Sequence, residues 1–189
     1  MAKAHRAILG SLYSRGRVPE AAEMERLFTD VGGEAALAEL RRLDLVVFSK
    51  AGELAGAYPM TTETTPHRLV FPDREVYAMC AIDALSVTPM FGGEVEIRSR
   101  CRVTGEAVVI HQRDERILCA SPGTTMAGVR WQSPCGHAAH SLCMEMVFLK
   151  DNDAVEAWRG GAVEHHSVFN LPDAVEFGAR FFKPLLAGA

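Results

Sequence analysis

Residues 76–87 read Val-Tyr-Ala-Met-Cys-Ala-Ile-Asp-Ala-Leu-Ser-Val, a run that is apolar on every face of a helix except at Asp83 and Ser86. Because Asp73 can cap the start of a helix, we expect one helix from Asp73 to about Val87. A helix that is apolar all round is a buried helix. The sequence therefore predicts that this segment lies in the core of the second part of the chain.

Asp83 is the unexpected residue of this helix. A buried carboxylate is costly unless it is paired or hydrogen-bonded, and burial raises its pKa so that it can hold a proton near neutrality. Cys80 lies three residues earlier, and positions three apart share one helix face, with Cβ atoms about 5–6 Å apart. Thiol and carboxyl can therefore share a pocket. Alternatively, Asp83 bonds a neighbouring backbone or Arg side chain, and Cys80 packs as a small hydrophobe.

The segments that follow this helix indicate an α+β fold. Alternating apolar residues predict strands, because a period of two is typical of a half-buried strand. Gly160-Gly161 suits the end of a short helix, and Pro172 suits the first turn of the last one. We expect strands at residues 69–71, 94–103, 107–112, 126–131 and 143–149, and helices at 154–159 and 172–186. This part is predicted to be a mixed β-sheet domain around the buried helix.

The N-terminal part has a different pattern. Helices are expected at residues 4–13, 19–28 and 33–43, and short strands at 46–48 and 54–58 then form a hairpin. Three helices and a small hairpin suggest a winged helix. The polar segment 61–66 is the expected boundary. We therefore predict a winged-helix-like domain at residues 1–62 and a second domain at 63–189.

Composition and charge limit the classes of partner. The 189 residues carry a net charge of −4, and residues 1–60 hold eight basic and eight acidic side chains. A protein that reads a DNA duplex usually has a clear basic surplus, so we expect no nucleic acid as a partner. No apolar run reaches the roughly 18 residues that span a bilayer, and residues 1–6 do not begin a secretory signal. We expect a cytoplasmic protein without a membrane partner.

An ordered series of short motifs resembles the organomercurial (alkylmercury) lyase family. It consists of Tyr77-Ala-Met-Cys80-Ala-Ile-Asp83-Ala-Leu, Gly92, Ser99-Arg-Cys101, Thr104-Gly105, Ser141-Leu-Cys143 with an apolar strand after it, and Trp158. The resemblance is specific over roughly residues 70–160, and the series is far more specific than a Cys-x-x-Asp pair alone. That family also carries a winged-helix-like domain ahead of its catalytic domain, which implies that residues 63–189 are catalytic.

The resemblance implies that Cys80, Asp83 and Cys143 cut a carbon–mercury bond. Mercury is a soft metal that prefers thiolate, so Cys80 and Cys143 would hold it and should come within reach of one ion. Asp83 would deliver a proton to the departing carbon. The products would be a hydrocarbon and Hg(II), which cellular small thiols or a mercuric reductase must remove. No cofactor is required by this reaction.

Most of the remaining cysteines and histidines are expected to have a structural role or to lie at the surface. The five cysteines are an odd number, which in the cytosol favours thiols over a disulfide framework. Cys101 lies on the inner face of an alternating strand and is expected to be structural, as in the family, and Cys119 is expected to pack. His165-His166 is expected at the surface.

The segment 135–143 leaves a second kind of site open. Cys135, His137 and His140 could, with Cys143, bind zinc or copper, although their spacing matches no zinc-finger pattern. Met144 stands where the family commonly has a further cysteine, and Met79 replaces a common aromatic residue. Two alternatives to the lyase therefore remain: a non-catalytic homologue that binds a soft metal such as mercury or copper, and a metal-responsive winged-helix regulator that binds DNA.

Overall fold

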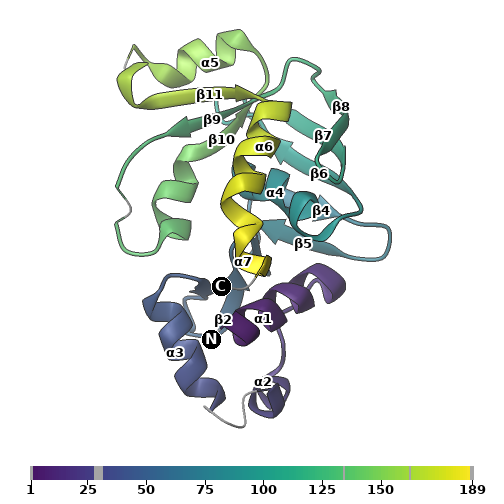
Figure 1. Ribbon diagram of the computed structural model, residues 1–189. Helices are drawn as coiled ribbons and strands as arrows, with labels where there is room; N and C mark the ends of the chain where they lie inside the picture. The colour runs from purple at the N-terminus through teal and green to yellow at the C-terminus, as the bar shows by residue number, and fades with distance from the viewer. Residues whose placement is uncertain (1, 28–31, 134, 162, 188–189) are drawn as a thin grey trace.

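The computed structural model describes residues 2–27, 32–133, 135–161 and 163–187. The chain is α+β, as expected, with helices packed against two sheets (Figure 1). None of the helices in these ranges has the length and apolar character that a membrane span requires.

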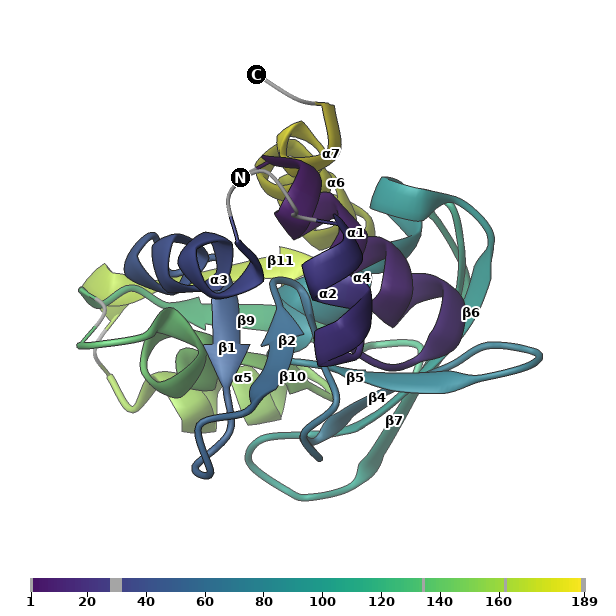
Figure 2. The ribbon, with the colours of Figure 1, turned by 90° about the horizontal axis from the view of Figure 1, so that it is seen from below.

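The N-terminal part consists of three helices and a hairpin. These elements are α1 (Ala2–Arg15), α2 (Ala21–Leu27), α3 (Gly33–Arg42), β1 (Val46–Phe48) and β2 (Leu54–Ala57). Residue 28, where we expected the second helix to end, lies outside the described residues. Ile8, Leu9 and Leu12 form the buried stripe of α1, as their helical spacing predicts. Seen from this end, the three helices group around the hairpin (Figure 2).

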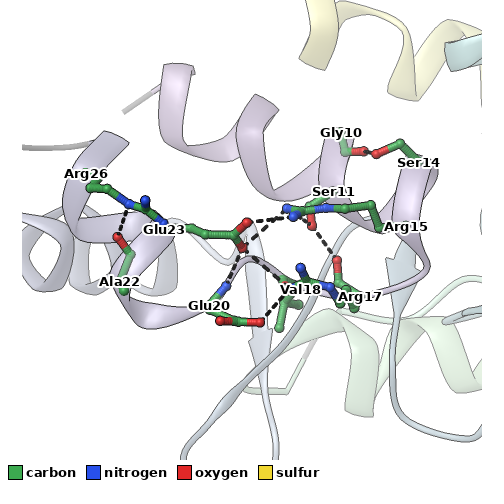
Figure 3. Close-up of polar contacts among 10 residues, drawn as sticks. All are labelled: Gly10, Ser11, Ser14, Arg15, Arg17, Val18, Glu20, Ala22, Glu23 and Arg26. Carbon is green, nitrogen blue, oxygen red and sulfur yellow. Dashed lines mark hydrogen bonds and ion pairs between the residues drawn. The ribbon is translucent and has the colours of Figure 1, made fainter.

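A polar cluster joins α1 to α2 (Figure 3). The Glu23 carboxylate accepts hydrogen bonds from Arg15 Nη1 at 2.6 Å and from the Glu20 backbone N–H at 2.8 Å. The second bond satisfies an N–H at the start of α2 that has no partner within the helix. The Arg15 hydrogen bond is the main reason why the pKa of Glu23 falls to about 2. This contact fixes the turn between the two helices.

The larger sheet has eight strands in the order β1-β2-β3-β5-β4-β6-β7-β8. Its further strands are β3 (Met60–Thr61), β4 (His67–Val70), β5 (Glu75–Ala78), β6 (Glu94–Arg100), β7 (Ala107–Arg113) and β8 (Arg116–Ser121). The N-terminal hairpin thus joins the rest of the sheet through β3, which pairs with both β2 and β5. The boundary after residue 62 stays a prediction.

The smaller sheet has the order β10-β9-β11, and α4 and α6 pack together beside it (Figure 1). Its strands are β9 (Met126–Arg130), β10 (Met146–Leu149) and β11 (His166–Asn170), and the helices of this part are α4 (Ala81–Phe91), α5 (Asn152–Arg159), α6 (Leu171–Phe182) and α7 (Pro184–Ala187). A Cβ at Gly178 of α6 would lie 2.1 Å from Ser86 Oγ of α4. Glycine therefore permits the close approach of these two helices.

The expectation of a mixed sheet was wrong. All the strand pairs in both sheets are antiparallel within the described residues, and the parallel contact is an isolated bridge between Cys101 and Phe148. Short turns join β6 to β7 and β7 to β8, and a tight turn can join only antiparallel neighbours.

The single helix expected at residues 73–87 was also wrong. Residues Glu75–Ala78 form β5, and the helix α4 begins only at Ala81. Val76 and Ala78 are buried whereas Glu75 is exposed, which is the period of a strand, and β5 hydrogen-bonds to β3 and β4 on either side. The first part of the segment therefore belongs to the sheet, and Cys80 precedes the helix.

Other element boundaries differ from those expected. Residues Leu142–Glu145 form a 3-10 helix, η2, so the strand expected from residue 143 begins only at Met146. The strands β8 and β11 were not expected, and neither contains a fully buried residue.

Candidate active site

Cys80 occupies the N-cap of α4 and is fully buried. Its backbone is extended, and its Sγ accepts a hydrogen bond from the Asp83 backbone N–H at 3.3 Å. A sulfur atom here takes the place of the Ser, Thr, Asp or Asn oxygen that usually caps a helix. The sulfur of Cys80 is therefore held at the positive end of the helix dipole.

Asp83 and Cys143 complete a compact cluster with Cys80. Asp83 lies in the first turn of α4 and is 1% exposed, and Cys143 lies in η2 and is also buried. The Cys143 thiol donates to Asp83 Oδ2 at 3.8 Å. One ligand atom from each of the three residues lies within 4.8 Å of the other two. Two soft sulfur donors and a carboxylate are thus close enough together to bind one ion.

Burial controls the protonation of this cluster. It raises the pKa of Asp83 to about 7, and the hydrogen bonds from Cys80 and Cys143 only partly oppose this shift. Burial also raises the pKa of the Cys80 thiol well above its usual value, with a further increase from Cys143 and Asp83, although the Asp83 N–H opposes it. Near neutral pH the Cys80 thiol therefore keeps its proton, while Asp83 can both accept and release one.

An apolar cavity of about 390 Å³ opens onto this cluster. Asp83 and Cys143 form part of its wall, whereas most of the other lining side chains are hydrophobic, including Ile82, Leu142, Phe177, Phe182 and Leu185. Trp131 and Phe181 also line it and are 42% and 67% exposed. The cavity can receive a small apolar group and present it to the thiol and the carboxyl.

Two residues of the N-terminal part hold the segment that leads to Cys143. Asp44 Oδ1 pairs with His137 Nδ1 at 2.7 Å, and its Oδ2 accepts from the Ala138 N–H at 2.9 Å. The Tyr58 hydroxyl accepts from the Ala139 N–H at 2.7 Å. Asp44 and Tyr58 also line the apolar cavity, and the sequence reasoning missed both. A Tyr in a hairpin gives no signal of such a contact, and Asp44 shows only an ordinary turn.

The candidate ligands Cys135, His137 and His140 do not join the cysteine cluster. Cys135 and His140 are exposed, and His137 faces Asp44. In the part of the chain that the structure describes, one group of His, Cys, Asp or Glu side chains has three ligand atoms close enough to share an ion. It consists of Cys80, Asp83 and Cys143.

Comparisons with known proteins identify the family of the chain. The family model described as alkylmercury lyase matches residues 60–183. The chain belongs to the alkylmercury lyase family. The matched region includes Cys80, Asp83 and Cys143, and it leaves α1, α2, α3 and the first hairpin outside. None of these findings favours the two alternatives, the metal-binding homologue and the DNA-binding regulator.

Curated alkylmercury lyases show distant similarity along much of the chain. The protein from Staphylococcus epidermidis is 28% identical over 139 residues, which is 74% of this chain and 63% of that protein. The Bacillus cereus protein is 27% identical over 142 residues, with the same two coverages, and the Pseudomonas putida protein is 25% identical over 131 residues, covering 69% and 60%. This member of the family thus spans less than two thirds of the length of these relatives.

The fold of this family member is also similar to that of a solved structure, the mercury-bound form of MerB2. The TM-score is 0.81 at 17% sequence identity, and the match covers 97% of this chain and 91% of the other. The α+β arrangement, including the N-terminal helices, is therefore shared despite the low identity.

The remaining sulfur and imidazole groups of this alkylmercury lyase homologue lie elsewhere. Cys101 follows β6 and is 2% exposed, as expected. Burial alone would raise the pKa of its thiol, but hydrogen bonds from Thr104 and from neighbouring backbone groups lower it. The packing role expected for Cys119 was wrong, because this residue is exposed on β8. His165 is exposed, as expected, whereas His166 is half-buried in β11, where its Nε2 is 2.7 Å from Arg130 Nε.

Proposed function

We propose that this protein is an organomercurial lyase that breaks the carbon–mercury bond of compounds of the form R–Hg–X by protonolysis. The observation that carries the proposal is the cluster of Cys80, Asp83 and Cys143, with ligand atoms within 4.8 Å of one another, beside an apolar cavity. Membership of the alkylmercury lyase family supports the same reaction. The cavity would hold the organic group R.

Cys143 is the first thiol that the substrate meets in this proposal. Its side chain lines the cavity, whereas Cys80 is fully buried and does not. Cys143 Sγ replaces X on the mercury, and the thiol proton leaves with X. A thiol that coordinates a metal loses its proton outright. Cys80 then adds as the second thiolate.

Asp83 transfers the second thiol proton to carbon. As Cys80 binds mercury, its proton passes to the Asp83 carboxylate and then to the carbon whose bond to mercury breaks. The products are R–H, HX and one Hg(II) ion held by two thiolates, which balances two thiol protons against R–Hg–X. A pKa near 7 suits this shuttle, because the carboxyl must both take and give a proton near neutral pH.

In this proposal, the release of Hg(II) requires a sulfur donor from outside the protein. Hg(II) held by two buried thiolates leaves only by ligand exchange, because it prefers sulfur to water. Small cellular thiols or a mercuric reductase would supply that sulfur in the cytoplasm. The reaction uses no cofactor beyond these thiols.

The N-terminal residues 1–62 are proposed to be a winged-helix-like domain that supports the site rather than reads DNA. The three helices and the hairpin have the order that a winged helix requires. Asp44 and Tyr58 bind the backbone of residues 138 and 139, close to Cys143. The equal numbers of acidic and basic residues in this part also argue against a duplex as ligand.

Benzene release from a phenylmercury compound in excess small thiol tests this function. We expect the parent protein to release benzene over many turnovers, and Cys80→Ala and Cys143→Ala to release none above the rate of the thiol alone. Cys119→Ala is the matched control, because this thiol is exposed on β8 and away from the cluster. A parent protein that binds mercury tightly yet frees no benzene would overturn the proposal.

A further inference from the structure

Met146 places a third sulfur atom beside the cysteine cluster. It is the first residue of β10, and its Sδ lies 3.6 Å from Cys80 Sγ. The side chain lines the apolar cavity together with Asp83 and Cys143. It also lines a second cavity of about 230 Å³, to which Cys143 contributes as well. The thioether therefore contacts Cys80 and shares the walls of both cavities with Cys143.

The chemistry of a thioether suits a soft ion at this point. Thiolate and thioether sulfurs are the protein ligands that soft metals select, whereas carboxylate oxygen suits harder ions. A zinc–thiolate bond is about 2.3 Å long, so two such bonds span up to about 4.6 Å, and a larger soft ion spans a little more. A separation of 3.6 Å between Cys80 Sγ and Met146 Sδ lets a single ion contact both sulfurs. A methionine side chain also has three rotatable bonds with which to adjust.

We propose that Met146 is the third sulfur ligand of the mercury ion that Cys80 and Cys143 hold. This inference rests on the proposed function for the identity of the ion. The thioether gives an electron pair to the metal and loses no proton, so its binding changes neither the proton balance nor the products. It stabilises bound Hg(II) after the carbon has left, and it slows the exchange that passes the ion to a small thiol.

Inorganic Hg(II), added as one equivalent, is the probe for this inference. X-ray absorption should count three sulfur neighbours around mercury in the parent protein and two in Met146→Leu. Release of the ion to excess glutathione should be at least about tenfold faster in Met146→Leu, since even changes outside a ligand shell typically cost about 10–100-fold in metal affinity. Met90→Leu is the matched control, because Met90 is a partly buried methionine at the far end of α4.

Met146→Gln keeps the length of the side chain and replaces sulfur with harder donors, so it should show the same two-sulfur site and fast release. If Met146→Leu does not fold, the same measurements on Met146→Gln test the inference. Two sulfur neighbours in the parent, or release rates in both variants equal to that of Met90→Leu, would overturn the inference. Benzene release is measured separately. A three-sulfur mercury site without turnover would reject the lyase alone, and turnover with a two-sulfur site would reject the Met146 ligand alone.

Discussion

The carboxyl of Asp83 is 1% exposed, and the side chains that donate to it are the thiols of Cys80 and Cys143, which are weak hydrogen-bond donors. The groups that shift the pKa of Asp83 include no Arg or Lys side chain that could neutralise the carboxylate. Its environment therefore favours the protonated form over the charged form. This is a cost to folding at neutral pH, and the proposed proton transfer gives a reason for a residue that packing alone would not require.

The raised pKa of Asp83 makes the stability of the protein depend on pH. The folded state binds the proton up to about pH 7, whereas an unfolded chain releases it near the ordinary value of 3.8. The stabilisation is therefore complete below the unfolded pKa and is lost as the pH rises through 7. Between pH 5 and pH 8 the free energy of unfolding should fall by roughly 2–3 kcal/mol more in the parent than in Asp83→Asn. Urea unfolding at the two pH values measures this. An equal fall in both proteins would contradict the assignment.

Asp83→Asn should also separate chemistry from binding. The amide keeps the size and polarity of the side chain but cannot shuttle a proton, so benzene release should fall by roughly 10²–10⁴, as is typical for a lost general acid. Hg(II) binding by Cys80 and Cys143 should persist. Single-turnover benzene release and mercury binding are measured on the same preparation. If Asp83→Asn cleaves phenylmercury at the parent rate, the proton comes from another group.

At the scale of elements, the apolar run of residues 76–87 predicted a buried segment correctly but not its secondary structure. A continuous apolar run suits a buried helix and a buried strand alike, and only the pairing of β5 with β3 and β4 decides between them. That pairing is a tertiary contact that the local pattern does not contain. The consequence for the site is specific, because Cys80 caps the helix instead of lying within it.

The approach of α4 and α6 gives a prediction about this pair of helices. A Cβ on Gly178 would meet Ser86 Oγ at 2.1 Å and the Ile82 carbonyl at 3.3 Å, so Gly178→Ala should destabilise the fold by about 1–3 kcal/mol. Adding Ser86→Ala should recover part of this loss by removing the hydroxyl. Gly10→Ala on α1 is the control, because nothing lies within 4 Å of a Cβ there, and it should be neutral or slightly stabilising. Thermal or urea unfolding compares the four proteins. No difference between Gly178→Ala and Gly10→Ala would show that the helices separate easily.

At the scale of the whole molecule, the sequence predicted the order of helices in both parts but not how the two parts meet. The resemblance to the lyase family identified Cys80, Asp83 and Cys143 as site residues but said nothing about their positions in space. Asp44, Tyr58 and Met146 could not be named in this way, because their roles depend on contacts between segments far apart in the chain. The contacts of Asp44 join the end of α3 to the segment before Cys143 and so link the N-terminal part to the site.

This link predicts that a change at Asp44 acts on a thiol that it does not touch. Asp44→Ala removes the acceptors of the His137 ring and the Ala138 N–H, so the segment that leads to Cys143 should open more often. We expect hydrogen exchange at Ala138 and Ala139 to quicken by about tenfold or more, because losing a hydrogen bond to a charged group typically costs about 1.5–3 kcal/mol. Benzene release should fall in parallel, since Cys143 would be held less firmly. Glu39→Ala is the control, because Glu39 pairs with Arg42 on the exposed face of α3, the helix that ends just before Asp44. If the two variants exchange and turn over alike, the N-terminal part does not position Cys143.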